Sequence, residues 1–381
     1  MKAVFVISNF KWGGAERQAM LLARGLKAKG IEVAVFALET NPARVDQICR
    51  EEQIQYGSFP FQGRTRLVRF VASVIGIERA LRRFRADVLL PYTTLPNVVC
   101  GLVWKMTGAS TCIWNQRDAG VEHHRIPWRS LEGIAVRNTP HFCSNSMPGM
   151  RFLQEQLKVS PALISIIPNG VRLDPVRKSR TEWRKELGLS ESTRLACMIA
   201  NINRNKDHAT LLRAWQVANE RLATQGLATV LALAGRIGDT YPELENLCKI
   251  LHLSGSVRFL GEIIDLAGLL NASDLSVFSS QREGIPNGVL EPMAAGLPVV
   301  ATDLPGIRQA VGEESGNYLC PIGDADFMGQ KIIELCSDEK RMKEVGARNK
   351  ERVEREFTAE ALTNRSLEMI QGLLERRGAR K

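Results

Sequence analysis

Two glutamates at a fixed spacing are the first residues in this chain that could do chemistry. Glu283 and Glu291 lie in QREGIPNGVLEP, residues 281–292, directly after the strand-like run DLSVFSS, residues 274–280. A helix in this segment must end near Gly296, since glycine is the favoured residue just past a helix end. The pattern therefore predicts Glu283 in a strand-to-helix loop and Glu291 in the first turns of the helix.

Paired carboxylates suit either acid/base hydrolysis of a glycosidic bond or the binding of sugar hydroxyls. We reject the hydrolytic pair, because Glu283 lies beside the N–H groups of a helix start, where an anionic sugar phosphate would bind. Both carboxylates are better suited to accept hydrogen bonds from sugar hydroxyls. Such bonds are specific, because a missing hydroxyl leaves a buried acceptor unpaired.

Two cations follow an earlier predicted strand. Arg204 and Lys206 lie in ANINRNKDHATLL, residues 200–212, between a strand end and a helix start. Two positive side chains and a helix N-terminus at one point suit a diphosphate. The alternative is that both are ordinary solvent-exposed loop residues.

Paired glycines, Gly13 and Gly14, stand between the first predicted strand and helix in NFKWGGAERQ, residues 9–18. Glycines there let backbone N–H groups approach an anion at a helix N-terminus. The alternative is a tight turn that needs glycine for a positive φ. The spacing is neither GxGxxG nor a Walker loop, so it indicates neither a dinucleotide site nor an ATPase.

Strand-like runs alternate with helix-length segments throughout the 381 residues, which predicts parallel βαβ units in two domains. The expected fold class is α/β, with two doubly wound Rossmann-like domains facing a cleft at the carboxyl ends of both sheets. The charged stretch 172–188 is the predicted linker. The predicted strands are 3–8, 32–38, 87–92, 110–116, 140–146 and 164–170, then 194–201, 229–235, 256–261, 274–280, 298–303 and 316–321. The predicted helices include 14–29, 64–87, 96–106, 128–136, 147–157, 208–223, 241–251, 326–336 and 359–376.

The net charge of +10 belongs to the N-terminal half, where residues 1–180 hold 26 Lys and Arg against 13 Asp and Glu. The charge concentrates in RTRLVRFVASVIGIERALRRFRAD, residues 64–87, which predicts a basic amphipathic helix. Such a helix can lie on an anionic membrane, or it can be a surface helix with an arginine-rich solvated face. Nucleic acid is not expected as a partner, because no recognisable module accompanies the charge. The residues that predict the helix are Leu67, Phe70, Val71, Val74, Ile77 and Leu81, with Arg66, Arg69, Arg79, Arg82, Arg83 and Arg85 around them.

The sequence indicates neither a membrane-spanning protein nor a secreted one. No apolar stretch reaches membrane-spanning length, and the first residues are better explained as a strand than as a signal peptide. The eight scattered cysteines contain no CxxC pair, so we expect buried thiols in a reducing cytoplasm.

The chain resembles the family-4 retaining glycosyltransferases of the GT-B architecture over essentially its whole length. The motifs that carry the resemblance are GGAER (13–17), SNS (144–146), IIPNGVRLD (166–174), RNKDHATLLRAW (204–215), VRFLGEI (257–263) and the glutamates Glu283 and Glu291 at the family's spacing. The resemblance implies an N-terminal acceptor-side domain, residues 1–171, on which a C-terminal helix at about 359–381 packs back. It implies a nucleotide-sugar-binding domain at residues 172–358.

The family's residue roles carry over to matching positions. Glu283 would contact hydroxyls of the transferred sugar and Glu291 the nucleotide ribose, while Arg204 and Lys206 would neutralise the diphosphate. Gly13 and Gly14 would let the N-terminal domain approach the same diphosphate. The catalytic set is thus Glu283, Arg204, Lys206 and Arg117, and the donor-binding set is Gly13, Gly14, Gly261, Gly284, Ile285, Asn287, Gly288, Val289, Leu290 and Glu291.

Several departures from the family pattern bear on these roles. CIWNQRDAG, residues 112–120, lacks the histidine that many relatives have there, so Arg117 or Asp118 would occupy its region, with His123 and His124 further on. Proline at Pro292 removes a helical hydrogen bond, which predicts a helix start near Asn287 or Gly288, or a local kink. Asn201 stands where relatives have an arginine, and Gln309 where many have a glutamate.

The expected activity is transfer of a hexosyl or N-acetylhexosaminyl group, with UDP-sugar as the default donor and a lipid-linked or glycan acceptor in cell-surface polysaccharide, lipopolysaccharide or glycolipid biosynthesis. The expected location is the cytoplasm, where the protein could also bind peripherally to the inner face of the membrane. The DxD of GDADF (323–327) is interpreted as an aspartate cap of the next helix, so no metal and no cofactor are expected. The alternatives are another GT-B enzyme, such as a UDP-sugar epimerase or a phosphorylase, and a non-catalytic binding protein of this fold.

Overall fold

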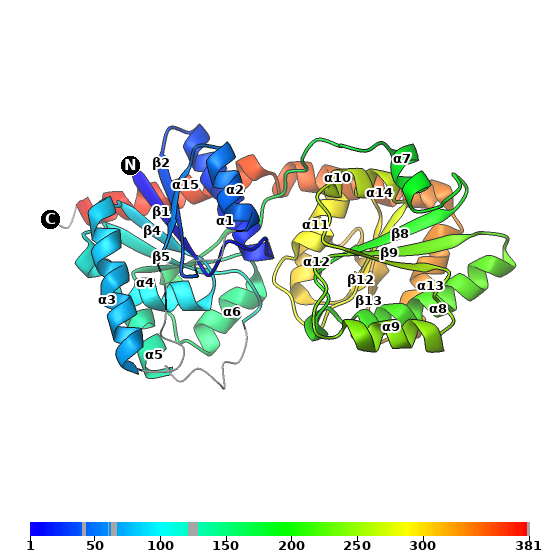
Figure 1. Ribbon diagram of the computed structural model, residues 1–381, viewed down its shortest axis with the longest axis horizontal. Helices are drawn as coiled ribbons and strands as arrows, with labels where there is room; N and C mark the ends of the chain where they lie inside the picture. The colour runs from blue at the N-terminus through cyan, green and yellow to red at the C-terminus, as the bar shows by residue number, and fades with distance from the viewer. Residues whose placement is uncertain (40–42, 60, 62–66, 121–128, 379–381) are drawn as a thin grey trace. The chain divides into compact units, whose positions relative to one another are not determined.

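The computed structural model describes residues 1–39, 43–59, 61, 67–120 and 129–378. The chain divides into two compact units (Figure 1). The N-terminal unit comprises Met1–Gly170 with Ala359–Lys381, and the C-terminal unit comprises Val171–Thr358. The boundary expected after residue 171 thus lies one residue from the observed one.

A parallel sheet of seven strands forms the centre of the N-terminal unit, as counted over the described residues, in the order β3-β2-β1-β4-β5-β6-β7. Strands buried on both faces contain near-continuous apolar runs, and the first strand, KAVFVI, is buried at every position after Lys2. The strands are β1 (Lys2–Ile7), β2 (Glu32–Ala37), β3 (Gln55–Ser58), β4 (Val88–Pro91), β5 (Thr111–Gln116), β6 (His141–Ser144) and β7 (Ile164–Ile166).

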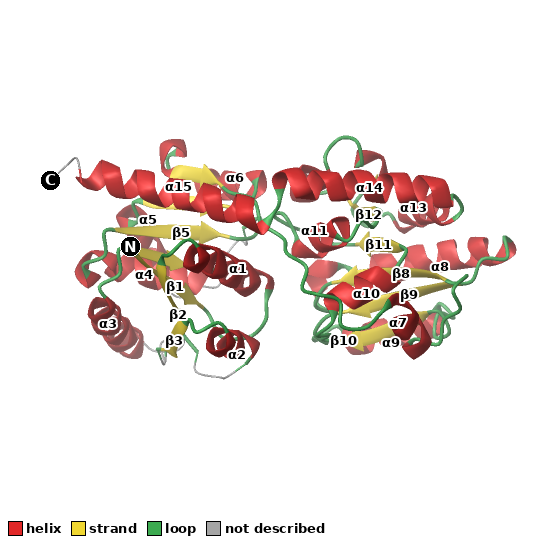
Figure 2. Ribbon diagram, turned by 90° about the horizontal axis from the view of Figure 1, so that it is seen from above, coloured by secondary structure: helices red, strands yellow, loops and turns green. Residues whose placement is uncertain are grey.

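Helices cover both faces of this sheet (Figures 1 and 2). Helices α1, α2 and α15 share one apolar cluster with β1 and β2, whereas α3 and α4 pack on the opposite face. The final helix therefore returns to the N-terminal unit, with Leu362 and Ile370 buried. The helices of this unit are α1 (Gly14–Ala28), α2 (Arg44–Glu51), α3 (Leu67–Phe84), α4 (Thr94–Thr107), α5 (Arg129–Asn138), α6 (Met147–Glu155), the 3-10 turn η1 (Pro161–Leu163) and α15 (Ala359–Gly378).

The second parallel sheet belongs to the C-terminal unit and has six strands among the described residues, in the order β10-β9-β8-β11-β12-β13. Alternate residues of β8 face opposite clusters, since Met198 packs toward α8 and Cys197 toward α10. The strands are β8 (Arg194–Ile199), β9 (Thr229–Ala234), β10 (Val257–Gly261), β11 (Leu275–Phe278), β12 (Val299–Thr302) and β13 (Leu319–Cys320). The helices are α7 (Arg180–Glu186), η2 (Arg204–Lys206), α8 (His208–Thr224), α9 (Tyr241–Ile250), α10 (Leu266–Ala272), α11 (Asn287–Ala294), α12 (Pro305–Val311), η3 (Gly316–Tyr318), α13 (Ala325–Cys336) and α14 (Glu339–Glu356).

Other global expectations can be compared with this fold. All eight cysteines are buried free thiols, as predicted. Among the described residues, no helix combines the length and the apolar character that crossing a membrane requires. The sequence analysis missed α2 and β3, because their short segments, RVDQICRE and QYGS, are rich in polar residues.

The predicted linker at 172–188 is partly wrong, because α7 forms inside it and belongs to the C-terminal unit. Ser179 and Glu182 form a capping box at its start. The helix then buries Trp183, whose indole N–H donates to Asp265 Oδ2 at 2.8 Å. A charged sequence with a proline resembled a linker because its buried side chains are only two, Trp183 and Arg184.

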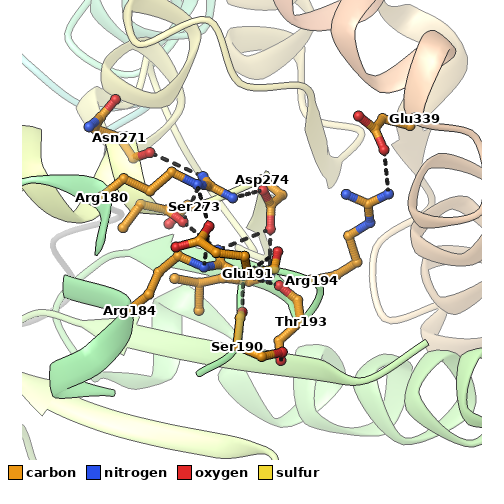
Figure 3. A network of polar contacts seen from close by, with 12 residues as sticks. Arg180, Arg184, Ser190, Glu191, Thr193, Arg194, Asn271, Ser273, Asp274 and Glu339 are labelled. Carbon is orange, nitrogen blue, oxygen red and sulfur yellow. Dashed lines mark hydrogen bonds and ion pairs between the residues drawn. The ribbon is translucent and has the colours of Figure 1, made fainter. Parts of the chain in front are cut away.

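Arg184 connects α7 to the segments that precede β8 and β11 through a network of polar contacts (Figure 3). Its side chain is 1% exposed, and Nη1 donates to the Ala272 carbonyl at 2.9 Å. Nη2 donates to the Ser190 carbonyl at 2.9 Å and also to that of Thr193. Asp274 directly precedes β11. Its Oδ2 lies 3.5 Å from Arg184 Nη1, and its Oδ1 lies 2.7 Å from Arg180 Nη2. The guanidinium thus satisfies carbonyls from two loops that precede β8 and β11.

We predict that Arg184→Met lowers the free energy of unfolding of the C-terminal unit by about 3 kcal/mol, because it leaves buried carbonyls without a donor and removes one of the cations beside Asp274. Arg180→Met is the matched control: its side chain is 35% exposed, so we expect a loss of about 1 kcal/mol or less. Urea denaturation of the full-length variants measures both. Equal losses for the two variants would contradict the assigned role of Arg184.

Candidate active site

The strand order of the C-terminal sheet reverses between β8 and β11, which are hydrogen-bonded neighbours. β9 and β10 lie on one side of this point, and β12 and β13 on the other. In open parallel sheets, ligands bind at the carboxyl ends of the strands where the order reverses. The loops that leave β8 and β11 here contain Lys206 and Glu283, two of the predicted site residues.

Lys206 and Glu283 form an ion pair between these two loops, Nζ to Oε1. The side chains are 21% and 12% exposed, so the pair is largely shielded from water. Ser280 Oγ lies 2.7 Å from the same Glu283 oxygen. The Lys206 ammonium also lies 5.0 Å from the centroid of the Phe278 ring. The structure therefore brings together one cation and one carboxylate that the sequence placed 77 positions apart.

Hydrogen bonds between the two loops fix the positions of these side chains. Gln281 N–H donates to the Asn205 carbonyl at 2.8 Å, and the Asn205 side chain donates to the Arg282 carbonyl at 3.0 Å. Ser279 Oγ donates to the Lys206 carbonyl at 2.9 Å. The loop after β8 is thus held to the residues that directly precede Glu283 in the loop after β11.

Helix α11 begins at Asn287, with Pro286 as its N-cap residue, so the prediction of a late start is confirmed. A side chain at Gly288 would place its Cβ 2.2 Å from the Ile199 carbonyl, so glycine is required where α11 meets the end of β8. The N–H groups of Val289 and Leu290 donate to the Pro286 carbonyl at 3.1 and 3.2 Å. The first turn of α11 therefore lies close against the end of β8.

Glu291 lies inside α11 and is buried, at 4% exposure, whereas Glu283 precedes the helix in the loop. Both glutamates occupy the elements that the spacing predicted. Pro292 follows within the helix, and Leu297 N–H donates to its carbonyl at 3.0 Å. The other residues predicted for donor binding in this loop, Gly284 and Ile285, are both buried.

Arg204 does not join the ion pair of Lys206. Its side chain is 79% exposed and lies 3.5 Å from Glu243 on α9, which is 68% exposed. An ion pair between two such exposed groups is worth about 1 kcal/mol or less, so little energy holds the guanidinium there. Its predicted contact with a diphosphate stays a prediction.

A histidine that the sequence analysis did not single out lies next to this site. His208 is the first residue of α8, after Asp207, which caps the helix with its side chain. It is 2% exposed. Burial, and after it the charge of Lys206, lowers the pKa of His208 to about 4, so the imidazole is neutral at pH 7. Lys206 is therefore the cation at this point of the site.

Gly261 ends β10, the edge strand of the C-terminal sheet, with φ +66°. Its carbonyl accepts a hydrogen bond of 2.8 Å from Gly235 N–H, at the end of β9. Asp324 caps α13 by accepting from Phe327 N–H at 2.9 Å, which confirms the interpretation of the DxD as a helix cap. This carboxylate is engaged in a structural hydrogen bond.

Gly13 and Gly14 begin α1 in the N-terminal unit, directly after the loop that follows β1. The alternative of a turn that needs positive φ is wrong, because Gly13 has φ −97° and ψ 174°. A Cβ at residue 13 would meet only the carboxylate end of the flexible Glu16 side chain, so the local packing does not by itself require glycine there. Gln18, one turn later, exchanges hydrogen bonds of 2.8 and 3.0 Å with the backbone of Gly170.

Arg117 follows β5 at the carboxyl edge of the N-terminal sheet. Its Nη2 donates to Asn115 Oδ1 at 2.6 Å and to Tyr92 Oη at 3.2 Å. Asp118 accepts from Gln116 at 2.5 Å and from Gly120 N–H at 2.8 Å. His123 and His124, which follow further along the sequence, lie outside the described residues.

The sequence analysis missed the polar residues that orient the ion pair, chiefly Ser279, Ser280 and Asn205. A signal for the serines was present, because both end a strand whose carboxyl end was already assigned to the site. Asn205 could not have been found in this way, since its role depends on the 3-10 turn that brings its backbone to the second loop.

Comparisons with known proteins are consistent with this arrangement. Residues 12–175 match the family model described as Glycosyltransferase Family 4, and residues 179–352 match that described as Glycosyl transferases group 1. N-acetyl-alpha-D-glucosaminyl L-malate synthase of Bacillus anthracis is 29% identical over 49% of the chain, and the match spans about half of that relative, 48% of its length. An Escherichia coli relative, UDP-Gal:alpha-D-GlcNAc-diphosphoundecaprenol alpha-1,3-galactosyltransferase, is 22% identical over 71% of the chain and 72% of its own length.

Solved structures show the same fold over nearly the whole chain. Anabaena Alr3699/HepE in complex with UDP and glucose aligns with a TM-score of 0.85 and 18% identity, covering 98% of this chain and all of that one (100%). WaaG, a glycosyltransferase involved in lipopolysaccharide biosynthesis, aligns with a TM-score of 0.74 and 17% identity, with coverage of 98% and 100%. Together the two family models span almost all of residues 12–352. The chain therefore belongs to the family-4 glycosyltransferases, and its two parallel-sheet units are those of the GT-B fold.

Proposed function

We propose that the protein transfers a sugar from a nucleotide-sugar, with UDP-sugar as the expected donor, to a lipid-linked or glycan acceptor of cell-surface polysaccharide or lipopolysaccharide synthesis. The observation that carries the proposal is the Lys206–Glu283 pair, held by hydrogen-bonded loops where the strand order reverses. Two comparisons support the donor: the Anabaena structure contains UDP and glucose, and the name of the E. coli relative specifies UDP-Gal.

The proposed roles follow from charge and position. Lys206 stabilises the negative charge that develops on the departing nucleoside diphosphate, together with the positive end of α11. Glu283 accepts hydrogen bonds from hydroxyls of the transferred sugar, and Glu291 from the ribose. When the diphosphate binds, Lys206 shares its positive charge between Glu283 and the phosphate, so the ion pair prepares both groups without a large rearrangement.

Retention of the anomeric configuration is part of the proposal. Attack of the acceptor on the face from which the diphosphate leaves requires no protein nucleophile, because a leaving phosphate oxygen takes the acceptor proton. The transfer also needs no metal in this proposal, because a protein cation stands at the site and the Asp324 carboxylate of the DxD caps a helix. Activity is therefore expected to withstand a chelator.

Helix α3 supports a peripheral contact with an anionic membrane at the cytoplasmic face. The predicted apolar stripe is mostly used inside the protein, since Phe70, Ile77 and Leu81 are buried. The opposite face exposes Val71 at 47% and Ile75 at 45%. Exposed arginines continue this face toward the C-terminal end of the helix, at Arg79, Arg82 and Arg83. An apolar patch followed by cations fits a lipid headgroup region.

We predict that Lys206→Ala weakens UDP binding about tenfold to a hundredfold, because it removes a charged hydrogen-bond donor to the diphosphate. Glu283→Gln is expected to keep UDP binding within about threefold and to lower turnover of the donor by about a hundredfold or more. Calorimetric titration with UDP, and nucleotide release from a panel of UDP-, GDP- and ADP-sugars, measure the two effects.

Lys343→Ala is the control for the lysine, because it removes an exposed ion pair with Glu339 in the same unit. Thermal unfolding of each variant separates lost binding from lost fold. If Lys206→Ala and Glu283→Gln bind and release nucleotide like the wild type, the site assignment is wrong. A wild-type protein that binds UDP yet neither hydrolyses nor transfers any donor would be a non-catalytic member of the fold.

For the membrane contact, we predict that the protein sediments with vesicles of phosphatidylglycerol and phosphatidylcholine but not with phosphatidylcholine alone. Arg82→Gln with Arg83→Gln should weaken this binding about tenfold or more, since each basic residue near an anionic surface is worth about 1 kcal/mol. Arg348→Gln with Lys350→Gln removes two exposed charges from the C-terminal unit and serves as the control. Equal losses for the two double variants would mean that net charge, and not α3, causes the binding.

A further inference from the structure

The N-terminal sheet has its own point of strand reversal, between β1 and β4. Ser8 follows β1 and Thr93 follows β4, and their hydroxyls lie 2.7 Å apart across this point. Thr93 has φ +73°, which is a strained conformation for a β-branched residue. Tyr92, beside it, meets Arg117 from the end of β5. The carboxyl edge of this sheet therefore gathers polar side chains at the place where such sheets bind ligands.

The guanidinium of Arg117 is fixed in one orientation. Its carbon lies 4.6 Å from the centroid of the Tyr92 ring, and Nη2 is held by Asn115 and Tyr92. Asn115 is itself locked, since its side chain donates to the carbonyls of Pro91 and Ile113 at 3.0 and 2.9 Å. Asn145 donates to the Arg117 carbonyl at 3.2 Å. A long, flexible side chain has thus lost most of its freedom before any ligand binds.

This fixed cation has no ion-pair partner among the described residues. Its Nε and Nη1 are buried there, and apart from the neutral Cys143 thiol they have no hydrogen-bond partner in that part of the chain. Burial raises the pKa of Tyr92 and that of Cys143, so both neighbours are neutral at pH 7. A shielded guanidinium without an anion is costly, and its planar donors match the oxygens of carboxylates and phosphates.

We propose that Arg117, oriented by Tyr92 and Asn115, forms an oxyanion subsite at the carboxyl edge of the N-terminal sheet, which takes a carboxylate or phosphate group of a sugar substrate. This inference rests on the proposed function for the nature of the ligand. An arginine stays protonated and cannot accept a proton from the acceptor hydroxyl. Arg117 is therefore a specificity-determining residue, which selects substrates that carry a negative charge.

The test uses inorganic phosphate as the probe and the full-length Lys206→Ala variant as the background, so that the cation of the other site is absent. Phosphate dissociation constants come from the shift of the thermal midpoint. We expect Arg117→Gln to raise the dissociation constant for phosphate about tenfold or more, and Arg117→Lys to raise it less. Arg151→Gln removes an exposed arginine of α6 and should leave this dissociation constant unchanged.

Tyr92→Phe provides a second variant should Arg117→Gln fail to fold, because it keeps the ring and removes only the hydroxyl that orients Nη2. It should weaken phosphate binding about threefold. Phosphate binding that is the same in folded Arg117→Gln or Tyr92→Phe as in the background protein overturns the subsite. This outcome is separate from failure of the proposed function, which would appear as absent UDP binding in protein with Lys206 intact.

Pairs of sugars that differ in one anion identify the source of the group. UDP-glucuronate against UDP-glucose tests a charge on the transferred sugar, and glucose 1-phosphate against methyl glucoside tests a charge on the acceptor. Arg117→Gln should weaken the acidic member of one pair at least tenfold, with its neutral member unchanged. Equal weakening of charged and neutral members would overturn the role in anion recognition.

Discussion

The ion pair between Lys206 and Glu283 is the contact on which the candidate site depends. It joins two loops that leave neighbouring strands at the point where the order of the C-terminal sheet reverses. The pair is largely shielded, so its two charges interact more strongly than they would at a solvent-exposed surface. Hydrogen bonds from Ser280, and between the loops, keep the two charged groups together. The proposed site for a sugar diphosphate thus has its cation and its carboxylate in place without a ligand.

The N-terminal sheet also has a point where the strand order reverses, but the charged groups at that point are paired differently. There too the strands reverse order, and polar side chains gather at their carboxyl ends. The cation in this place, Arg117, is held by neutral partners and not by a carboxylate. The C-terminal unit pairs its lysine internally, whereas the N-terminal unit presents an arginine that lacks an anion within the described residues. Under the proposed function, this difference in charge balance would let the two units bind different groups of the substrates.

Much of the fold follows from the sequence, because buried parallel strands contain apolar runs that are easy to recognise. Strand β1 and strand β9 are buried over almost their whole length, and both were predicted within two residues of their observed ends. Elements with polar sequences were harder to predict. Strand β3 was missed, and α7 was assigned to a linker because a buried arginine cannot be distinguished from an exposed one by its sequence.

The site was only partly predictable for a similar reason. The spacing of Glu283 and Glu291 placed both glutamates on the correct elements, and Pro292 indicated the start of α11. The partner of Glu283 could not be inferred from spacing, because it lies in a loop that reaches the site only through the order of the strands. Arg204 shows the opposite case: it precedes Lys206 by only two residues, yet its side chain lies beside α9.

A crystal structure of the protein with UDP tests the central claim most directly. The account predicts a phosphate oxygen of UDP within hydrogen-bond distance of Lys206 Nζ, at the first turn of α11, and a ribose hydroxyl on the Glu291 carboxylate. UDP bound elsewhere, with the Lys206–Glu283 pair unchanged and remote from the nucleotide, would contradict it.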